Sequence, residues 1–467
     1  MSKTRVNVTD LFNEAKALFD KEAYQEAVQK FITVSFAQPS NWHAYALLGA
    51  CFENMGYRDA AIVSMQRASI ILPKHPQIWL NLARLLSSSG RAEEAVEAFE
   101  KVVELQPGHL EAHHQAGMML RGMNRNEESL GHFDHVVAGT AKSDKEKEYQ
   151  VVAEWVRSLD RLTMGDYQAA WKDYETRWRL PGTFVHRLDG PEWKGESLEG
   201  KRIVLTYEQR FGDVINFVRF IPRLKALGAE VIVQSPPELA HQLAHMTTEV
   251  EIVDKDVEPP PFDYYVLVTS VPAILNLSLD DVMQDEVPYL QVDERDRKPE
   301  LPMRRGTWLK VGLLWTGKPD PNRSIPFEHM TPLLRHPGVS FYSFQLGKNS
   351  ADPHKQGMSW LVNDLSPEIS DFYDSSLLLK EMDLFITIDT AAAHQAGALG
   401  VPVWTLLIYA PDWRWMRDRE DSPWYPSMRF FRQTRKNSWK EAARNLDVAF
   451  EQWVESNPPP VVVNSGG

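Results

Sequence analysis

A period of 34 residues runs through the first part of the chain. Small or apolar residues recur at this interval in separate series. The series are Ala27, Ala61, Ala95 and Ser129; Phe31, Met65, Phe99 and Phe133; Leu18, Phe52, Leu86 and Leu120; Gly56, Gly90 and Asn124; and Pro39, Pro73 and Pro107. Within each unit the apolar residues have helical spacing, and a proline closes the second helix. Because one helix pair cannot bury its apolar face alone, the pattern predicts pairs stacked into a helical solenoid.

The run 90–95 (G-R-A-E-E-A), with Phe99 and Pro107 after it, resembles a tetratricopeptide repeat. The resemblance covers about residues 8–142 as four repeats, and a divergent fifth is expected at 165–174. Each repeat of this kind leaves one face uncovered by its neighbours. The resemblance therefore implies a concave face that binds a protein or peptide partner.

Three histidines of this region, His109, His113 and His114, lie close together in the sequence. Their proximity suggests a metal site, but no cysteine is nearby and their spacing straddles one helix. We expect solvated or packing histidines, and the sequence predicts no metal site.

The composition of the 467-residue chain narrows the functional classes. Its net charge of −13 argues against a nucleic-acid partner, because neutralising phosphates needs a basic surface. The single cysteine, Cys51, excludes an internal disulfide framework and favours a reducing cytoplasm. Since the sequence has no run of about 18 apolar residues and no signal-like start, we expect a cytoplasmic protein without a transmembrane segment.

A later stretch predicts a parallel α/β fold. An apolar run at 384–388 is followed by an alanine-rich run at 391–399 and a second apolar run at 403–407. This order predicts a strand, a helix and a second strand of a parallel sheet. Asp389 and Thr390 stand where the first strand ends, which is where such sheets bind ligands.

The start of this helix is a candidate anion site. Backbone N–H groups from Ala391 onwards would point at the ligand and favour a phosphate, with His394 one turn further on. The alternative is that Asp389 and Thr390 only cap the helix and that His394 packs on its first turn.

A second strand–helix–strand unit begins with the strand predicted at 202–205. The turn after it carries Glu208, Gln209, Gly212 and Asp213. Asp213 could act as a general base if it faced a bound hydroxyl. The alternative is that it only caps the following helix.

Another strand is predicted at 311–315, and Lys318 and Arg323 lie in the loop after it. Cations at the carboxyl end of a strand suit a diphosphate, while ordinary surface charge is the alternative.

Composition also sets the expected domain boundaries. Helix-breaking proline and glycine become frequent after Trp178. We expect the solenoid at 1–180, two α/β halves at 181–298 and 299–456, and a loose tail at 457–467.

Three runs in the α/β part carry a second resemblance. These runs are 208–215 (E-Q-R-F-G-D-V-I), 322–326 (N-R-S-I-P) and 389–403. They resemble the heptosyltransferase-type glycosyltransferases, most of all the bacterial group in which such a domain follows tetratricopeptide repeats. The segments 165–178 and 412–426 also fit that group. The resemblance implies two Rossmann-like halves in the GT-B arrangement.

The resemblance also implies roles for individual residues. Asp213 would deprotonate the acceptor, beside an acceptor-side loop that includes Glu208, Gln209 and Gly212. The donor diphosphate would be held by Asp389, Thr390 and His394, and neutralised by Arg323. The implied enzyme is an inverting, metal-independent hexosyl- or heptosyltransferase. It would use a nucleotide-diphosphate sugar, no further cofactor, and an acceptor protein recruited by the repeats.

Two positions depart from the family pattern. Arg210 stands where the family has a small residue, and Ala391 stands where it has glycine. These departures favour an alternative function, a non-catalytic scaffold whose degenerate domain binds proteins or sugar nucleotides.

Four tryptophans could stack on a base or sugar, although such density is more typical of a core. They are Trp404, Trp413, Trp415 and Trp424.

Overall fold

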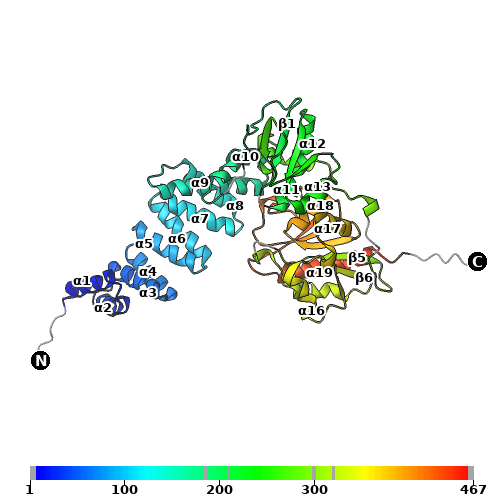
Figure 1. The fold of residues 1–467 in the computed structure, drawn as a ribbon. Coiled ribbons are helices and arrows are strands. Elements are labelled where there is room, and N and C mark those ends of the chain that lie inside the picture. Colours follow the sequence, from blue (N-terminus) through cyan, green and yellow to red (C-terminus); the bar gives the residue numbers. More distant parts are fainter. Residues whose placement is uncertain (1–6, 184–186, 209, 297–300, 318–320, 461–467) are drawn as a thin grey trace, which may run out of the picture. The chain divides into compact units, whose positions relative to one another are not determined.

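The computed structural model describes residues 7–183, 187–208, 210–296, 301–317 and 321–460 (Figure 1). Contacts between Cα atoms divide the chain into two compact units, Met1–Asp160 and Arg161–Gly467. The first unit is helical, and the second contains two parallel sheets.

Helices of the first unit alternate in a regular order. They are α1 (Val8–Asp20), α2 (Tyr24–Ala37), α3 (Trp42–Asn54), α4 (Arg58–Ile71), α5 (Pro76–Ser88), α6 (Ala92–Leu105), α7 (Leu110–Gly122), α8 (Asn126–Ala138) and the start of α9 (Asp144–Met164). The odd-numbered helices begin every 34 residues, and α2, α4, α6 and α8 do the same. The period seen in the sequence is therefore a period of helix pairs.

The positions that defined the period fill the core of this unit. Ala27, Ala61, Ala95 and Ser129 are all 0% exposed, because each lies where two helices approach closely. The turn positions Gly56, Gly90 and Asn124 all have positive φ, of 81°, 74° and 61°. Glycine and asparagine tolerate this backbone conformation best, which explains their recurrence there.

Helix α10 (Tyr167–Tyr174) and the short helix η1 (Glu175–Arg179) belong to the second unit. The expected boundary at residue 180 thus lies inside that unit. Two buried contacts account for this: Trp171 Nε1 donates to the Leu277 carbonyl at 2.7 Å, and Arg177 Nη2 donates to Ser270 Oγ at 2.7 Å.

The first sheet has four parallel strands in the order β3-β2-β1-β4. Its strands are β1 (Arg202–Thr206), β2 (Glu230–Ser235), β3 (Glu251–Asp254) and β4 (Tyr264–Leu267). The helices of this first α/β half are α11 (Phe211–Phe217), α12 (Ile221–Ala226), α13 (Pro237–Leu243), α14 (Val271–Ile274) and α15 (Leu279–Met283).

The second sheet has six parallel strands in the order β10-β9-β8-β5-β6-β7. Its strands are β5 (Leu309–Leu313), β6 (Val339–Ser343), β7 (Val362–Asp364), β8 (Leu384–Ile388), β9 (Val403–Leu407) and β10 (Met428–Arg432). The helices of this second α/β half are α16 (Asp352–Lys355), α17 (Phe372–Leu379), α18 (Ala391–Ala398) and α19 (Lys440–Ser456). Read from β7, this is the 3-2-1-4-5-6 order of doubly wound nucleotide-binding folds, and the first sheet has its first four places.

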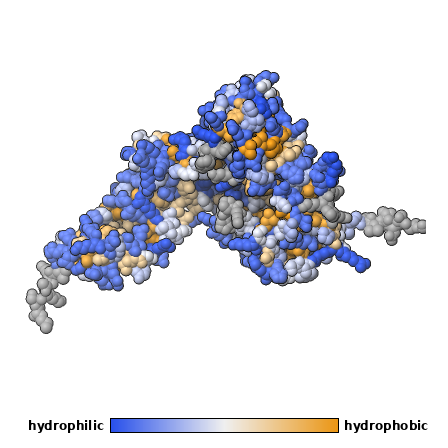
Figure 2. All heavy atoms as spheres, in the orientation of Figure 1, coloured by the Kyte–Doolittle hydropathy of each residue, from blue (hydrophilic) through white to orange (hydrophobic). Residues whose placement is uncertain are grey.

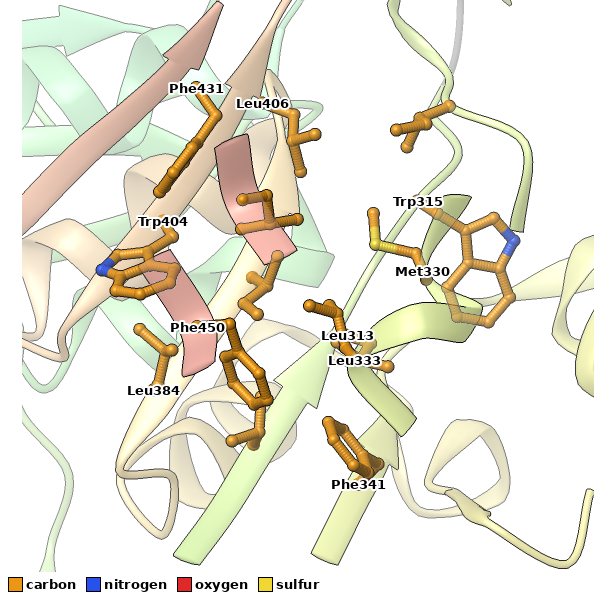
Figure 3. Close-up of a cluster of buried hydrophobic side chains, with 14 of the residues drawn as sticks. Leu313, Trp315, Met330, Leu333, Phe341, Leu384, Trp404, Leu406, Phe431 and Phe450 are labelled. Carbon is orange, nitrogen blue, oxygen red and sulfur yellow. The ribbon is translucent and has the colours of Figure 1, made fainter. Parts of the chain in front are cut away.

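A dense apolar cluster covers one face of the second sheet (Figure 3). Leu313, Phe341 and Leu384 project from three neighbouring strands, and Phe450 of α19 packs over them. Each of these side chains is at most 1% exposed. Burying one contributes about 1.5–3 kcal/mol, so this cluster fixes the sheet and the loops at its carboxyl edge.

No helix in the described ranges is long and apolar enough to cross a membrane. Figure 2 shows hydrophilic residues over most of the face that it draws, with separate smaller hydrophobic areas.

Candidate functional site

The strand order of each sheet reverses once. From β1 the chain goes to β2 and β3 on one side and returns to β4 on the other, and β5 and β8 flank the same reversal in the second sheet. Open parallel sheets bind ligands beyond the carboxyl ends of these two strands. The loops after β1, β4, β5 and β8 therefore form the candidate site.

The described residues that the sequence nominated lie in these loops or in the helical turns that follow. Glu208, Gly212 and Asp213 follow β1; Arg323 follows β5, in η5 (Pro321–Arg323); and Asp389, Thr390, Ala391 and His394 follow β8. Gln209 and Lys318 lie outside the described residues.

The two loop systems meet where α11 lies against α18. A Cβ on Gly212 would stand 3.1 Å from His394 Cδ2 and 3.5 Å from Ala391 Cα. Only a residue without a side chain allows this approach without displacing a neighbour. Gly212 thereby brings the predicted acceptor-side and donor-side residues together.

The candidate base, Asp213, lies in the first turn of α11 with its side chain 23% exposed. Its Oδ1 accepts a hydrogen bond from Arg414 Nη2 at 2.8 Å. Arg414 belongs to η10 (Trp413–Trp415) in the second α/β half. The base is thus a partly exposed carboxylate that an arginine from the other half holds.

Asp389 and Arg323 form an ion pair, with Arg323 Nη1 3.0 Å from Asp389 Oδ2. Burial raises the pKa of the Asp389 carboxyl, and Arg323 opposes that shift. Thr390 occupies the N-cap position of α18, but its side chain makes no capping hydrogen bond. The Thr390 side chain therefore does not cap the helix, and the ligand-binding role of both residues stays a prediction.

His394 contacts aromatic side chains of the second half. Its Nδ1 lies 3.0 Å from the Tyr425 hydroxyl, and its ring stacks on Trp415 with 4.8 Å between centroids. Burial lowers the pKa of His394 to about 3, and Arg414 acts in the same direction. At neutral pH the imidazole is therefore uncharged, so it brings no positive charge to the candidate site.

Glu208 ties together the ends of β1 and β4. Its carboxylate accepts hydrogen bonds from the Thr269 backbone N–H at 3.0 Å and from Thr269 Oγ1 at 2.7 Å. Arg177 Nη2 donates to the same hydroxyl at 2.8 Å. Burial raises the pKa of Glu208, and the Arg177 charge opposes this. Glu208 thus holds the loop after β1 against the residues that follow β4.

The two departures from the family pattern cause no backbone strain. Ala391 opens α18 and is not among the described residues with positive φ. Alanine therefore fits where the family has glycine. Arg210 is extended, with φ −123°, and its side chain is exposed, so it does not fill the turn.

A cavity of about 390 Å³ opens beside the α11–α18 contact. The first turn of α18 forms one wall through Thr390, Ala391 and Ala392, and Gly317 follows β5 on another side. Aromatic and polar side chains complete the lining, among them Phe211, Glu238, Phe344, Gln345, Asp371 and Phe372. The cavity therefore combines ring surfaces with the amino end of a helix.

Sequence reasoning missed several of these residues. Phe344 and Gln345 directly follow β6, so their position next to the end of an apolar strand was a usable signal. The sequence carried one signal for Arg414 and Tyr425, which was their place in the segment 412–426. That segment resembles the family, but the resemblance does not indicate which of its side chains contact the site.

The four tryptophans belong to the core. Trp404, Trp413, Trp415 and Trp424 are between 0% and 8% exposed, and none lines the cavity described above.

Comparison with known proteins identifies the repeats of the first unit. Residues 76–109 match the tetratricopeptide repeat family. The first unit contains tetratricopeptide repeats. The matched residues begin with α5 and end just before α7, so they span one complete helix pair.

Two curated proteins are similar to parts of this chain at low sequence identity. Protein FlbA of Caulobacter vibrioides is 24% identical over 466 residues, which cover 92% of this chain and 76% of FlbA. Protein O-mannosyl-transferase TMTC3 of Homo sapiens is 24% identical over 143 residues, which cover 27% of this chain and 16% of TMTC3. A solved structure of MamA from Desulfovibrio magneticus RS-1 is 15% identical, covers 37% of this chain and 95% of that chain, and has a TM-score of 0.31.

The histidines of the tetratricopeptide unit have packing or capping roles. His109 Nδ1 accepts from the Ala112 N–H at 3.2 Å, and the His114 ring stacks on Tyr149. His113 Nε2 faces the Pro107 carbonyl oxygen at 2.9 Å. Within the described ranges, no group of three His, Cys, Asp or Glu side chains could hold a metal ion.

Proposed function

We propose that the second unit is a glycosyltransferase with its two α/β halves in the GT-B arrangement. It transfers a sugar from a nucleotide-diphosphate sugar to a hydroxyl acceptor, with inversion and without a metal ion. The tetratricopeptide repeats bind a protein partner, which is the acceptor or brings it. A cytoplasmic location stays a prediction.

One observation carries this proposal: the ligand-binding edges of two parallel sheets converge on one cavity. The sheets contribute α11 and α18, which touch at Gly212 and His394, and both helices line the cavity through Phe211 and Ala391. A shared cleft between two doubly wound halves suits a reaction with two substrates, because each half can hold one.

The nucleotide-diphosphate sugar would bind to the second α/β half. The first turn of α18 forms a wall of the cavity, and the positive end of a helix dipole favours a diphosphate there. The rings of Phe344 and Phe372 offer faces on which a nucleobase can stack. Arg323, held by Asp389, is 28% exposed in the loop after β5, and we propose that it neutralises the charge of the diphosphate.

The acceptor suits the first half, where Asp213 would serve as base. Asp213 takes the proton of the acceptor hydroxyl, and the hydroxyl oxygen forms a bond to the anomeric carbon. The bond from that carbon to the diphosphate breaks, and its electron pair leaves with the nucleoside diphosphate. A general base of this kind contributes about 100- to 10,000-fold to the rate.

A protein acceptor is supported by the repeats and by one relative. Tetratricopeptide units expose concave surfaces that suit peptides and proteins. TMTC3 is named as a protein O-mannosyl-transferase, although only 16% of that protein is matched.

A second function, a non-catalytic scaffold, is favoured by one observation. The candidate base is paired with Arg414, and Arg323 is paired with Asp389. Charges that already satisfy one another are also what a purely structural interface would contain.

Turnover distinguishes the two functions. The full chain is incubated with a panel of UDP-, GDP-, ADP- and dTDP-sugars, and release of the nucleoside diphosphate is measured, with water or added protein as acceptor. The enzyme predicts release from at least one donor and a loss of about 100-fold or more in Asp213→Asn. Absence of release from every donor, or equal release by Asp213→Asn, contradicts it.

A further inference from the structure

One buried guanidinium connects the two α/β halves at the candidate base. Arg414 Nη2 donates to Asp213 Oδ1 at 2.8 Å, and Arg414 Nε donates to Asn216 Oδ1 at 3.2 Å. Its third nitrogen, Nη1, donates to Asp412 Oδ1 at 2.9 Å. Each nitrogen of the guanidinium therefore has an acceptor, and two of the three acceptors belong to α11.

The plane of this guanidinium is fixed from several sides. It lies 4.5 Å from the centroid of the Trp413 ring and 5.1 Å from that of Phe217. Asp412 is partly buried, with its side chain 20% exposed, and burial alone would raise its pKa, but Arg414 and Arg323 hold that pKa below the ordinary range. Asp412 thus stays ionised and anchors Arg414 from its own segment.

We propose that Arg414 is the positioning residue for Asp213, so that the base is assembled from both α/β halves. The inference rests on the proposed glycosyltransferase activity. By holding Oδ1, Arg414 directs the remaining oxygen of the carboxylate toward the acceptor. Asp213 belongs to α11 in the first α/β half, and the arginine that orients it belongs to η10 in the second. Neither half alone therefore holds an oriented base.

A lysine in place of Arg414 keeps the charge but not the geometry. Its ammonium is a point charge that cannot serve Asp213, Asn216 and Asp412 with the planar fork of arginine. Misplacing a reacting group by about 1 Å can lower the rate by about 100-fold. Arg414→Lys therefore separates a positioning role from simple charge pairing.

Arg219 provides a matched control for the interface itself. It is also buried, at 3% exposed, and its Nη1 crosses between the halves to donate to the Trp424 carbonyl at 2.8 Å. Arg219→Lys thus disturbs the same interface by the same chemical change. Its guanidinium lies over the rings of Tyr289, Trp424 and Tyr425 instead.

The experiment compares kcat and KM for nucleoside diphosphate release from the panel of UDP-, GDP-, ADP- and dTDP-sugars. The full-length proteins are the native chain, Arg414→Lys, Arg219→Lys and Asp412→Asn, and melting temperatures confirm that each is folded. We expect Arg414→Lys to lose about 100-fold in kcat with the donor KM unchanged. Asp412→Asn should lose kcat in the same way, because it loosens the anchor, and it replaces Arg414→Lys if that variant does not fold.

Arg219→Lys should keep kcat within a few-fold of the native value. The inference is overturned if Arg414→Lys retains native kcat, or if Arg219→Lys loses as much kcat as Arg414→Lys. Failure of the native chain to release nucleoside diphosphate from any donor is a different result, because it overturns the proposed function and this inference with it.

Discussion

Gly212 of α11 and His394 of α18 lie so close that a Cβ on Gly212 would stand 3.1 Å from the His394 ring. The contact joins the first α/β half to the second at the candidate site. His394 is itself held by the Tyr425 hydroxyl and the Trp415 ring, so it cannot move away freely.

Gly212→Ala should therefore destabilise the second unit. The added methyl group forces α11 and α18 apart, and overpacking of this kind costs about 1–3 kcal/mol. Urea unfolding measures the change in the free energy of unfolding. Gly131→Ala in α8 is the control, since a Cβ there meets nothing within 4 Å and alanine favours the helix. Equal stability of the Gly212 variant and the native chain would show that the contact is looser than described.

Tyr425→Phe should weaken the interface between the α/β halves. The Tyr425 hydroxyl accepts from Asn216 Nδ2 at 2.9 Å, and Asn216 is 0% exposed. Removing the hydroxyl leaves that buried amide without this acceptor, which costs about 1–3 kcal/mol. Differential scanning calorimetry should show a lower melting temperature. The exposed Tyr57 gives the control, and a Tyr425→Phe variant no less stable than Tyr57→Phe would refute the prediction.

Asp160→Ala should destabilise the tetratricopeptide unit strongly. Asp160 is 0% exposed and accepts hydrogen bonds from Arg121 at 2.5 Å, Asn126 at 2.8 Å and Ser129 at 2.7 Å. Breaking a buried charged network costs about 3–5 kcal/mol. Asp134→Ala, which removes a carboxylate that is 49% exposed, should cost at most about 1 kcal/mol. Chemical denaturation followed by helical circular dichroism compares the two, and similar losses would contradict the buried network.

Acid should destabilise the same unit through His132. Its Nδ1 lies 3.0 Å from His113 Nδ1, and burial, followed by the charges of His113 and His135, lowers the pKa of His132 to about 4. The unfolded chain has the ordinary value of about 6.5 and binds more protons in this range. Stability is therefore complete above pH 6.5 and falls as the pH drops toward 4.

Urea midpoints at pH 7.5, 6 and 5 measure this slope. His132→Asn should reduce it, because one group with a lowered pKa is removed. The exposed His354 is the control, and His354→Asn should leave the slope as it is. A slope that His132→Asn does not change would exclude His132 as its source.

The sequence predicted the central strands better than the edges of the sheets. Strands β8 and β9 have the bounds that the apolar runs at 384–388 and 403–407 indicated. Three strands at sheet edges, β3, β7 and β10, were not predicted. Edge strands are exposed on one side and carry polar residues, as in Val362-Asn363-Asp364 of β7, so their apolar signal is weak.

The sequence predicted which strand ends lie at the candidate site. It did not predict which residues of the two α/β halves contact each other. Asp213 and Asp389 follow strongly apolar strands, so their positions could be read locally. Arg414 is 201 residues from Asp213, and Tyr425 is 209 residues from Asn216. Which side chains meet at such separations depends on how the two sheets pack, and no local pattern encodes it.

We predict that the cavity at the first turn of α18 binds a nucleoside diphosphate. Ala392→Asp tests it, because an acid in the first turn favours the helix but repels a phosphate in the cavity that Ala392 lines. Ala392→Ser is the neutral control.

The measurement is thermal shift of the native chain and both variants with UDP-, GDP-, ADP- and dTDP-sugars and the free nucleoside diphosphates. A ligand at 100 times its Kd stabilises the folded state by about 2.7 kcal/mol. We predict that at least one of these compounds raises the melting temperature of the native chain and of Ala392→Ser, but not that of Ala392→Asp. No shift of the native chain with any compound, or equal shifts in all three proteins, would contradict the claim.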